Sequence, residues 1–192
     1  MQHFSGLYYH IYNRGTNREP IFTCEENYLF LLRQIKHFLP YYHLAFIAYC
    51  LMPNHYHFLI RVEADGELSP FIQRLFNSYT QAFNRQHHRS GTLFEGRAKS
   101  KLIDEDSYVV HLVRYIHLNP VQAGLVKQAK DWPFSNYQEW IGQRPGTLYD
   151  PGFVKDNFPT PGEYENFVVS ELSVTLEKAL AAYYLDKSLA KV

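Results

Sequence analysis

The chain has 192 residues, of which 46% are hydrophobic and 20% charged, as expected for a soluble globular protein with one domain or one domain and an appendage. Its formal net charge is zero, so any nucleic-acid binding must come from a local basic patch rather than from the overall field. Two cysteines exclude a disulfide scaffold or a structural zinc cluster, and the lack of a long apolar run or a signal-peptide pattern favours a cytoplasmic protein without a membrane partner.

The hydrophobic pattern predicts six elements in the first half of the chain. They are a strand at 7–13, a helix at 25–38, strands at 42–51 and 56–62, a helix at 68–87 and a short strand at 98–103. Strand, helix, strand, strand, helix, strand is the order of the ferredoxin-like βαββαβ fold. We therefore expect an α+β protein with an antiparallel sheet and these helices on one face.

A third helix is predicted from Ser107 to about Leu118, where Asn119 and Pro120 end it because proline restricts the residue before it. The rest of the chain is rich in Pro-Gly turn signals. It predicts short helices and turns, followed by a long helix from about 162 to 189. We expect a main domain over 1–140 and a mainly helical C-terminal extension over 141–192, packed on the core.

Two histidines, His55 and His57, are separated by a single residue at the start of the third predicted strand. Residues two apart in a strand point to the same face, so both imidazoles project together while Tyr56 and Phe58 point the other way. Two imidazoles on a rigid strand make half of a metal site. The doublet fits equally well a pair of partly buried histidines satisfied by hydrogen bonds.

The predicted third helix carries two stripes of side chains. The core stripe, at i, i+3, i+4 and i+7, consists of Val109, Leu112, Val113 and Ile116. A polar and aromatic stripe, at about 100° per residue, consists of Tyr108, His111, Tyr115 and Asn119. Tyr115 stands out because a carboxamide follows it by one turn and a histidine precedes it by one turn. His117 points nearly opposite Tyr115.

Together, the histidine pair and Tyr115 suggest phosphoryl chemistry. A divalent cation held by His55, His57 and a third ligand would polarise a phosphate oxygen, and Tyr115 would attack the phosphorus. Asn119 is the candidate third ligand, and imidazoles with oxygen ligands suit Mg²⁺ or Mn²⁺. A tyrosyl phosphodiester conserves the energy of the broken bond, which suits strand transfer better than hydrolysis.

A basic stretch interleaved with aromatic residues runs from residue 74 to residue 101. Its candidate DNA-binding side chains are Arg74, Arg85, Arg97, Lys99 and Lys101. Arg14, in the loop after the first predicted strand, is a further candidate for the same surface. Basic groups among aromatic rings fit a surface for single-stranded nucleic acid. The stretch taken alone fits a solvated helix end and hairpin equally well.

Four stretches carry a family resemblance. They are 9–15 (YHIYNRG), 49–60 (YCLMPNHYHFLI), 91–97 (GTLFEGR) and 114–126 (RYIHLNPVQAGLV). In these motifs and their spacing the chain resembles the single-tyrosine HUH transposases and, within them, the REP-associated tyrosine transposases. It departs from the family pattern at Ala98, where an aromatic residue is expected, and residues 145–192 extend beyond that pattern.

The resemblance implies that residues 1–140 form a bacterial, nucleoid-associated HUH catalytic domain. Such a domain is an endonuclease and strand transferase that cuts and rejoins single-stranded DNA beside REP-like palindromes folded as hairpins. It implies Mg²⁺ or Mn²⁺ at His55, His57 and Asn119, and a transient 5′-phosphotyrosine on Tyr115 with a free 3′-hydroxyl on the other side. Related proteins are monomers or dimers.

Two other functions are compatible with the same residues. A non-catalytic hairpin-binding protein or repressor would keep the fold, although it would have no need of His55, His57 and Tyr115 together. A metal-dependent nuclease that uses water would need the histidines and leave Tyr115 a structural role. The three hypotheses differ in whether DNA is cut and whether it becomes attached to the protein.

Overall fold

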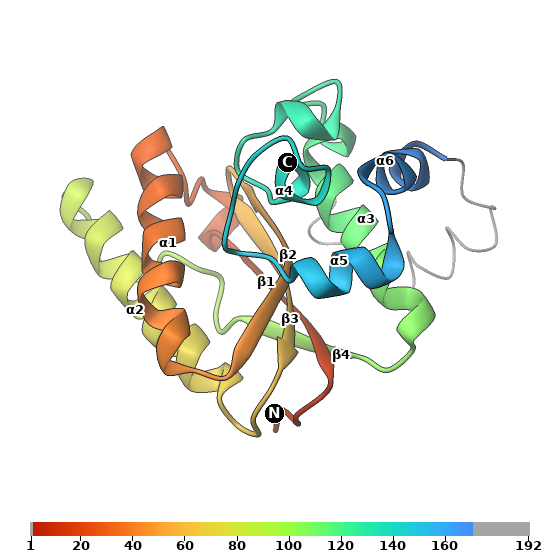
Figure 1. Ribbon diagram of the computed structural model, residues 1–192. Helices are drawn as coiled ribbons and strands as arrows, with labels where there is room; N and C mark the ends of the chain where they lie inside the picture. The colour runs from red at the N-terminus through yellow and green to blue at the C-terminus, as the bar shows by residue number, and fades with distance from the viewer. Residues whose placement is uncertain (1, 171–192) are drawn as a thin grey trace.

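The computed structural model describes residues 2–170 (Figure 1). The elements in chain order are β1 (Tyr8–Arg14), α1 (Glu25–Phe38), β2 (Leu44–Met52), β3 (His55–Val62), α2 (Leu68–Gln86), β4 (Lys99–Ile103), α3 (Asp106–Gln122), α4 (Tyr137–Trp140), α5 (Pro151–Asn157) and α6 (Pro161–Val169). The predicted order of strands and helices up to β4 is confirmed. Predicted and observed bounds of these six elements differ by at most two residues.

The four strands form one antiparallel sheet in the order β2-β3-β1-β4. Helices α1 and α2 cover one face of this sheet, and α3 to α6 lie on the other (Figure 1). The α+β ferredoxin-like prediction is therefore confirmed, with the third helix and the C-terminal segment as additions on the second face.

Alternation along β3 divides its side chains between two hydrophobic cores. Tyr56, Phe58 and Ile60 are buried in the core beneath α1 and α2. Leu59, on the opposite face, is buried with the apolar side of α3. His55 and His57 share the face of Leu59, so the strand presents both imidazoles to α3, as the residue pattern predicted.

The third helix runs further than predicted. It ends at Gln122, with Pro120 inside its last turn. A proline there removes only its own bond to the carbonyl of Ile116, and the next turn is still closed by the amide of Ala123, which donates to the carbonyl of Asn119 at 2.9 Å. Asn119 therefore keeps helical geometry relative to Tyr115. Of the predicted long C-terminal helix, α6 covers the start but ends at Val169, because Ser170 has an extended backbone. Residues 171–189 of that prediction lie outside the described residues.

The segment after α3 covers the outer edge of β2. The amide of Leu51 donates to the carbonyl of Phe134 at 2.9 Å, and the Trp132 indole donates to the carbonyl of Leu51 at 3.1 Å. The Trp140 indole donates to the carbonyl of Ile47, also at 3.1 Å. These bonds satisfy strand groups that would otherwise face water, and they attach the C-terminal segment to the sheet.

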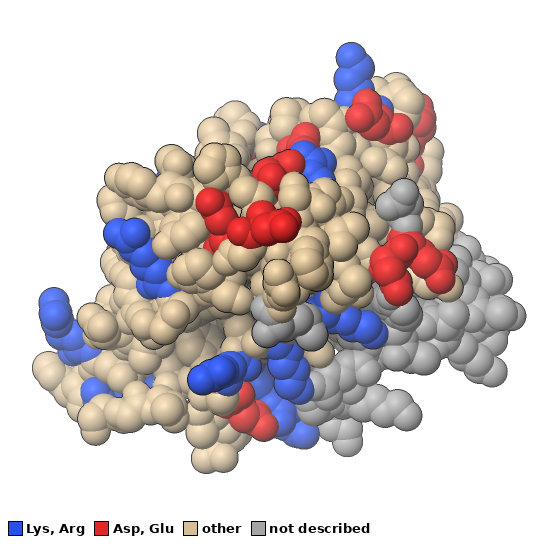
Figure 2. All heavy atoms as spheres, turned by 90° about the horizontal axis from the view of Figure 1, so that it is seen from below, with Lys and Arg blue, Asp and Glu red and all other residues tan. Residues whose placement is uncertain are grey.

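Charge on the surface is unevenly distributed despite the zero net charge. Seen from below (Figure 2), Lys and Arg side chains gather mainly in the lower half of the face, and Asp and Glu side chains mainly in the upper half. A polyanion would therefore meet a local positive field on part of this face. No helix within residues 2–170 is long and apolar enough to cross a membrane.

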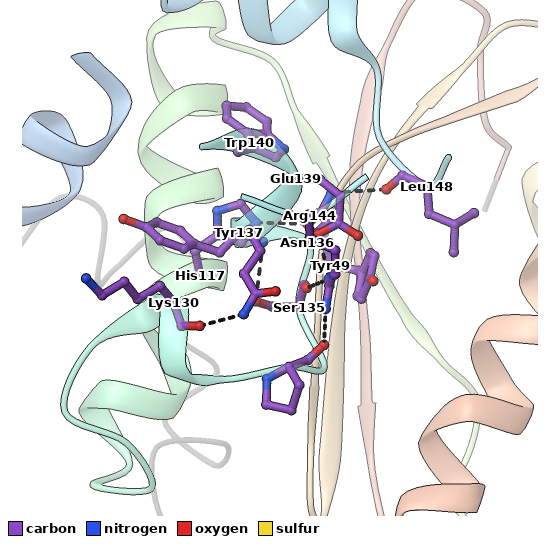
Figure 3. A network of polar contacts seen from close by, with 12 residues as sticks. Tyr49, His117, Lys130, Ser135, Asn136, Tyr137, Glu139, Trp140, Arg144 and Leu148 are labelled. Atoms are coloured by element: carbon purple, nitrogen blue, oxygen red, sulfur yellow. Dashed lines mark hydrogen bonds and ion pairs between the residues drawn. The ribbon is translucent and has the colours of Figure 1, made fainter. Parts of the chain in front are cut away.

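Asn136 is the centre of a buried polar network that links α3 to β2 (Figure 3). Its side-chain oxygen accepts from the Tyr49 amide and from the Nε2–H of His117, both at 2.8 Å. Its amide nitrogen donates to the carbonyls of Ile47 and Leu148 at 3.0 and 3.1 Å. Because Nε2 of His117 carries the proton, Nδ1 accepts from the Tyr164 hydroxyl at 2.5 Å. The network thus fixes His117 as a neutral structural residue.

Burial lowers the pKa of His117 from 6.5 to about 4, partly opposed by its hydrogen bond to Asn136. As the pH falls below 6.5, the unfolded chain binds this proton before the folded chain does, so the free energy of unfolding must fall. We expect His117 to account for a loss on the order of 3 kcal/mol between pH 7 and pH 4. Denaturant unfolding of the wild type and of His117→Gln at both pH values measures it. An equal pH dependence in the two proteins would contradict the assignment.

Candidate active site

The candidate site lies between the centre of the sheet and α3. Strand β3 supplies His55 and His57, and α3 supplies Tyr115 and Asn119. The rings of His55 and His57 are 5.1 Å apart between centroids, and the rings of His57 and Tyr115 are 5.6 Å apart. The phenol predicted to act with the histidine pair therefore lies on the same side of the sheet and in the same chain.

Each imidazole of the pair is held through its Nδ1 atom. Nδ1 of His55 donates to the side-chain oxygen of Asn54 at 2.7 Å. Nδ1 of His57 is 2.9 Å from Nε2 of His10, which is buried on the neighbouring strand β1. The bond to Asn54 fixes both the orientation and the tautomer of His55, because an amide oxygen only accepts, and the contact with His10 fixes the orientation of the His57 ring. They leave the Nε2 atoms of His55 and His57 buried and without a hydrogen-bond partner among the described residues.

Burial keeps these histidines neutral. It lowers the pKa of His55 to about 4. A hydrogen bond that the charged ring would donate to Asn119 acts in the opposite direction, and repulsion from Arg14 adds to the lowering. Burial lowers the pKa of His57 well below the usual range, with the neighbouring imidazoles adding to the effect. His10 is lowered to a pKa of about 3 by burial and by Lys101. Neutral imidazoles with free nitrogen lone pairs are the form that binds cations.

The amide of Asn119 lies at the centre of the site. Its side chain interacts with His55, with His57 and with the hydroxyl of Tyr115, and its amide nitrogen donates to the Tyr115 carbonyl at 2.8 Å. That donation leaves the amide oxygen as the group available to the histidines. Asn119 and the histidine pair thus place two nitrogen lone pairs and one oxygen in one region.

This donor set fits a divalent cation. Buried polar atoms normally have hydrogen-bond partners. The two Nε2 atoms on the adjacent imidazoles have none among the described residues, which indicates a site for a ligand. Two nitrogens and an amide oxygen suit Mg²⁺ or Mn²⁺. The residues 2–170 contain no group of three His, Cys, Asp or Glu that could hold a metal, and the donors that this site offers are the two imidazoles and the amide oxygen.

Tyr115 is half-buried, and its phenol is not acidic. Burial raises its pKa to about 12, although the hydrogen bond to Asn119 acts in the opposite direction. The buried Tyr12, which pairs with His57 across β1 and β3, also disfavours its phenolate. An attack by this oxygen therefore needs a positive charge or a base close to it.

The predicted DNA-binding residues are distributed over several elements. Arg14 makes a bidentate ion pair with Glu95, with one contact at 2.9 Å. Arg74 stacks on Phe38 with its guanidinium carbon 4.6 Å from the ring centroid, on the side of α2 that faces α1. Arg85 is exposed in the last turn of α2.

The other three predicted basic residues lie together at β4. Arg97 and Lys99 are exposed, and Lys101 is half-buried. Lys99 pairs with Tyr12 across β1 and β4, and its ammonium lies 5.7 Å from the centroid of that ring. Lys99 and Lys101 therefore line the sheet edge beside the histidine pair, and Arg97 precedes them in the chain.

The residue pattern did not single out three side chains that the structure places in the site: His10, Tyr12 and Asn54. His10 and Tyr12 alternate on one face of β1, which was visible in the sequence. Only the register of β1 against β3, with Tyr12 opposite His57, shows that this is the face of the histidine pair. Asn54 immediately precedes His55, a position typical of a side chain that hydrogen-bonds locally.

Comparison with known families agrees with this arrangement. The family described as "Transposase IS200 like" matches residues 3–119, more than half of the chain, and this range includes the histidine pair, Tyr115 and Asn119. The chain belongs to this family. The family resemblance inferred from the four motifs is thereby confirmed at this level.

Two curated relatives support the REP-associated branch of these IS200-like transposases. A protein of Haemophilus influenzae, whose name assigns it provisionally to the REP-associated tyrosine transposases, is 31% identical over 101 residues, covering 47% of this chain and 57% of its own length. The REP-associated tyrosine transposase of Escherichia coli is 28% identical over 97 residues, covering 50% of this chain and 56% of its own. The chain thus spans little more than half the length of these relatives.

The fold of this IS200-like family member is also similar to a solved structure. That structure is described as a REP-associated tyrosine transposase bound to a REP hairpin. The two superpose with a TM-score of 0.60 and 24% sequence identity, over 78% of this chain and 91% of the other. The similarity supports the fold.

Proposed function

We propose that this IS200-like transposase is a metal-dependent endonuclease and strand transferase for single-stranded DNA. It cuts and rejoins the strand next to hairpin-forming palindromes through a covalent bond to Tyr115. The observation that carries the proposal is the position of the Tyr115 ring 5.6 Å from the ring of His57, whose Nε2 is unpaired among the described residues. The relative seen bound to a REP hairpin supports DNA hairpins as the substrate class.

His55, His57 and Asn119 would hold the cation, and His10 and Asn54 would orient the two imidazoles. A bound Mg²⁺ or Mn²⁺ polarises a phosphate oxygen and offsets the negative charge that develops there. The imidazoles need no deprotonation at neutral pH because burial has already lowered their pKa values. The third ligand would be an amide, so the protein would add no negative charge at the cation, and the substrate phosphate would supply it.

Tyr115 would attack the phosphorus from the helical side of the site. The new bond joins its phenolic oxygen to phosphorus, and the bond from phosphorus to the 3′ oxygen breaks. The phenol loses its proton, and the released 3′ oxygen takes one up. Because one phosphodiester replaces another, a 3′-hydroxyl can reverse the step and rejoin a strand.

Both parts of the site come from one chain, so a single copy of the protein holds the nucleophile and the metal ligands together. The half-buried Tyr115 and the fully buried His57 limit the access of water to the reacting atoms. This favours attack by the phenol over attack by water.

Removal of the Tyr115 hydroxyl should abolish covalent attachment. We expect Tyr115→Phe to form no protein–DNA adduct with a labelled hairpin that carries a single-stranded flank and Mn²⁺, while it binds the hairpin within about threefold of wild type. Denaturing gels of reactions with 5′-labelled and 3′-labelled DNA show which end is attached. A nuclease that uses water would cut without an adduct, and a pure binder would not cut.

Tyr41→Phe is the matched control, because Tyr41 is exposed and lies against Arg74, away from the histidine pair. It should form the adduct at the wild-type rate. Adduct formation by Tyr115→Phe would show that another residue is the nucleophile, and the proposal would then be wrong.

Metal affinity should depend on the histidine pair and, to a smaller degree, on His10. We expect His57→Ala to lose measurable Mn²⁺ binding and cleavage, and His10→Ala to bind Mn²⁺ about 10–100-fold more weakly, since it removes only an orienting hydrogen bond. His37→Ala, at an exposed position on α1, is the control. Calorimetric titration measures the affinities, and gel shifts measure hairpin binding. Unchanged Mn²⁺ binding by His57→Ala would show that the pair is only structural.

The basic side chains at β4 should bind phosphates of the DNA backbone. Replacement of Arg97, Lys99 and Lys101 by Gln should weaken hairpin binding and reduce the salt slope of log K by about 0.7–0.9 for each phosphate that the protein no longer neutralises. Lys36, Lys130 and Lys155, which are exposed elsewhere, give a control of equal charge change. Binding measured by anisotropy at several salt concentrations yields both slopes. If the two triple variants have the same slope, β4 does not contact the backbone.

A further inference from the structure

The contact between His10 and His57 can be donated by either ring. Nε2 of His10 lies 2.9 Å from Nδ1 of His57, and both side chains are fully buried. A neutral imidazole carries one proton, on one of its two nitrogens. Since one ring must donate and the other must accept, the two rings change tautomer together. The pair therefore has two neutral arrangements, and it neither gains nor loses a proton between them.

Only one of these arrangements can bind a cation. When Nδ1–H of His57 donates to His10, Nε2 of His57 keeps its lone pair and can serve as a ligand. When Nε2–H of His10 donates instead, His57 carries its own proton on Nε2, and this atom cannot bind a cation. We call the first the binding arrangement and the second the blocked arrangement. In the binding arrangement the proton of His10 is on Nδ1, a buried atom without a hydrogen-bond partner among the described residues.

A cationic side chain lies on the other side of His10. Lys101 on β4 is the cross-strand partner of His10 on β1, and such partners are close neighbours on one face of a sheet. Lys101 is half-buried, and the exposed Asp104 is the acidic group that acts on it. Because β1 lies between β3 and β4, Lys101 and His57 flank His10 from opposite sides. The three side chains form a row across the sheet.

This row makes the two arrangements unequal in the field of Lys101. In the binding arrangement, His57 directs its N–H toward β1, and the proton of His10 is on the nitrogen turned away from His57. In the blocked arrangement, both N–H groups are directed away from β4. A positive charge repels the N–H end of a ring dipole and attracts the lone-pair end, and the effect is strong where water is excluded. The charge of Lys101 therefore favours the blocked arrangement.

We propose that Lys101 is a positioning residue whose charge favours the blocked arrangement of His10 and His57, and that a DNA phosphate bound to Lys101 shifts the pair to the binding arrangement. The phosphate offsets the charge of the ammonium, so the histidine pair becomes able to bind a cation when the strand is in place. By linkage, a cation at the pair strengthens the phosphate contact by the same factor. The inference rests on the proposed function for the identity of the cation and the phosphate.

The tautomers can be measured without metal, by nuclear magnetic resonance of protein with isotope-labelled histidine in EDTA. The chemical shift of each ring nitrogen shows whether it carries the proton, and His57→Gln assigns the signals of His57. We expect Lys101→Met to change the tautomer ratio of His57 by about fivefold or more toward Nδ1–H. Lys99→Met is the matched control, because Lys99 lies over the ring of Tyr12 on the same strand. It should change the ratio by at most about twofold.

Addition of a DNA hairpin with a single-stranded flank, still in EDTA, tests the role of the phosphate. The hairpin should shift the His57 ratio of wild type in the same direction as Lys101→Met, and should have little further effect on that variant. A ratio that Lys101→Met leaves unchanged would overturn the inference. A wild-type ratio that does not respond to bound hairpin would overturn the coupling to phosphate.

Calorimetric titration with Mn²⁺ separates this route from direct repulsion between Lys101 and the cation. Without DNA, Lys101→Met should bind Mn²⁺ about fivefold or more tightly than wild type. The gain should disappear in a His10→Phe background, because a phenyl ring keeps the volume but makes no hydrogen bond to His57. Direct repulsion would give equal gains in both backgrounds, and that result would contradict the inference. Circular dichroism confirms that each variant is folded.

Adduct formation with the hairpin, measured in parallel, keeps the two proposals apart. If the tautomers do not respond to Lys101→Met while wild type forms the Tyr115 adduct, the positioning role fails and the proposed function stands. If the tautomers respond while wild type binds no Mn²⁺ and forms no adduct, the action of Lys101 on the histidine pair stands and the catalytic function fails.

Discussion

The site depends first on the pairing of β1 with β3. This register places Tyr12 opposite His57 and brings Nε2 of His10 within 2.9 Å of Nδ1 of His57. The hydrogen bond turns the other nitrogen of His57 toward α3. A slip of one residue would move every side chain of β3 to the opposite face, and both imidazoles would then enter the aromatic core under α1 and α2. The hydrophobic pattern of Tyr56, Phe58 and Ile60 prevents this slip, so the same alternation that builds the core directs both imidazoles toward α3.

The sheet also separates two kinds of environment. On the side of α3, burial gives neutral imidazoles and a phenol whose pKa is raised to about 12. In the proposed function, their chemistry would therefore depend on a cation and on the phosphate of the substrate. On the side of α2, the sheet face carries tyrosine, phenylalanine and aliphatic side chains that are buried in the core beneath α1 and α2.

Most of the fold could be predicted from the sequence because the strands and first two helices have strong periodicity. His55, His57 and Tyr115 were predictable because strand and helix spacing alone decide where they point. The end of α3 was not, since Pro120 is tolerated in the last turn of a helix that Ala123 still closes. His10 could not be assigned because its role depends on the register between two strands far apart in the sequence.

The capping of β2 has a consequence for how copies of the protein meet. An exposed edge strand is a template for another chain, which can add to the sheet and lead to aggregation. Here the backbone of Phe134 and the indoles of Trp132 and Trp140 occupy the outward groups of Leu51 and Ile47. The opposite edge, β4, has only five residues and carries Lys99 and Lys101, whose charges repel a second copy of the same strand. The sheet is thus protected at both edges from the addition of strands from another copy of the protein.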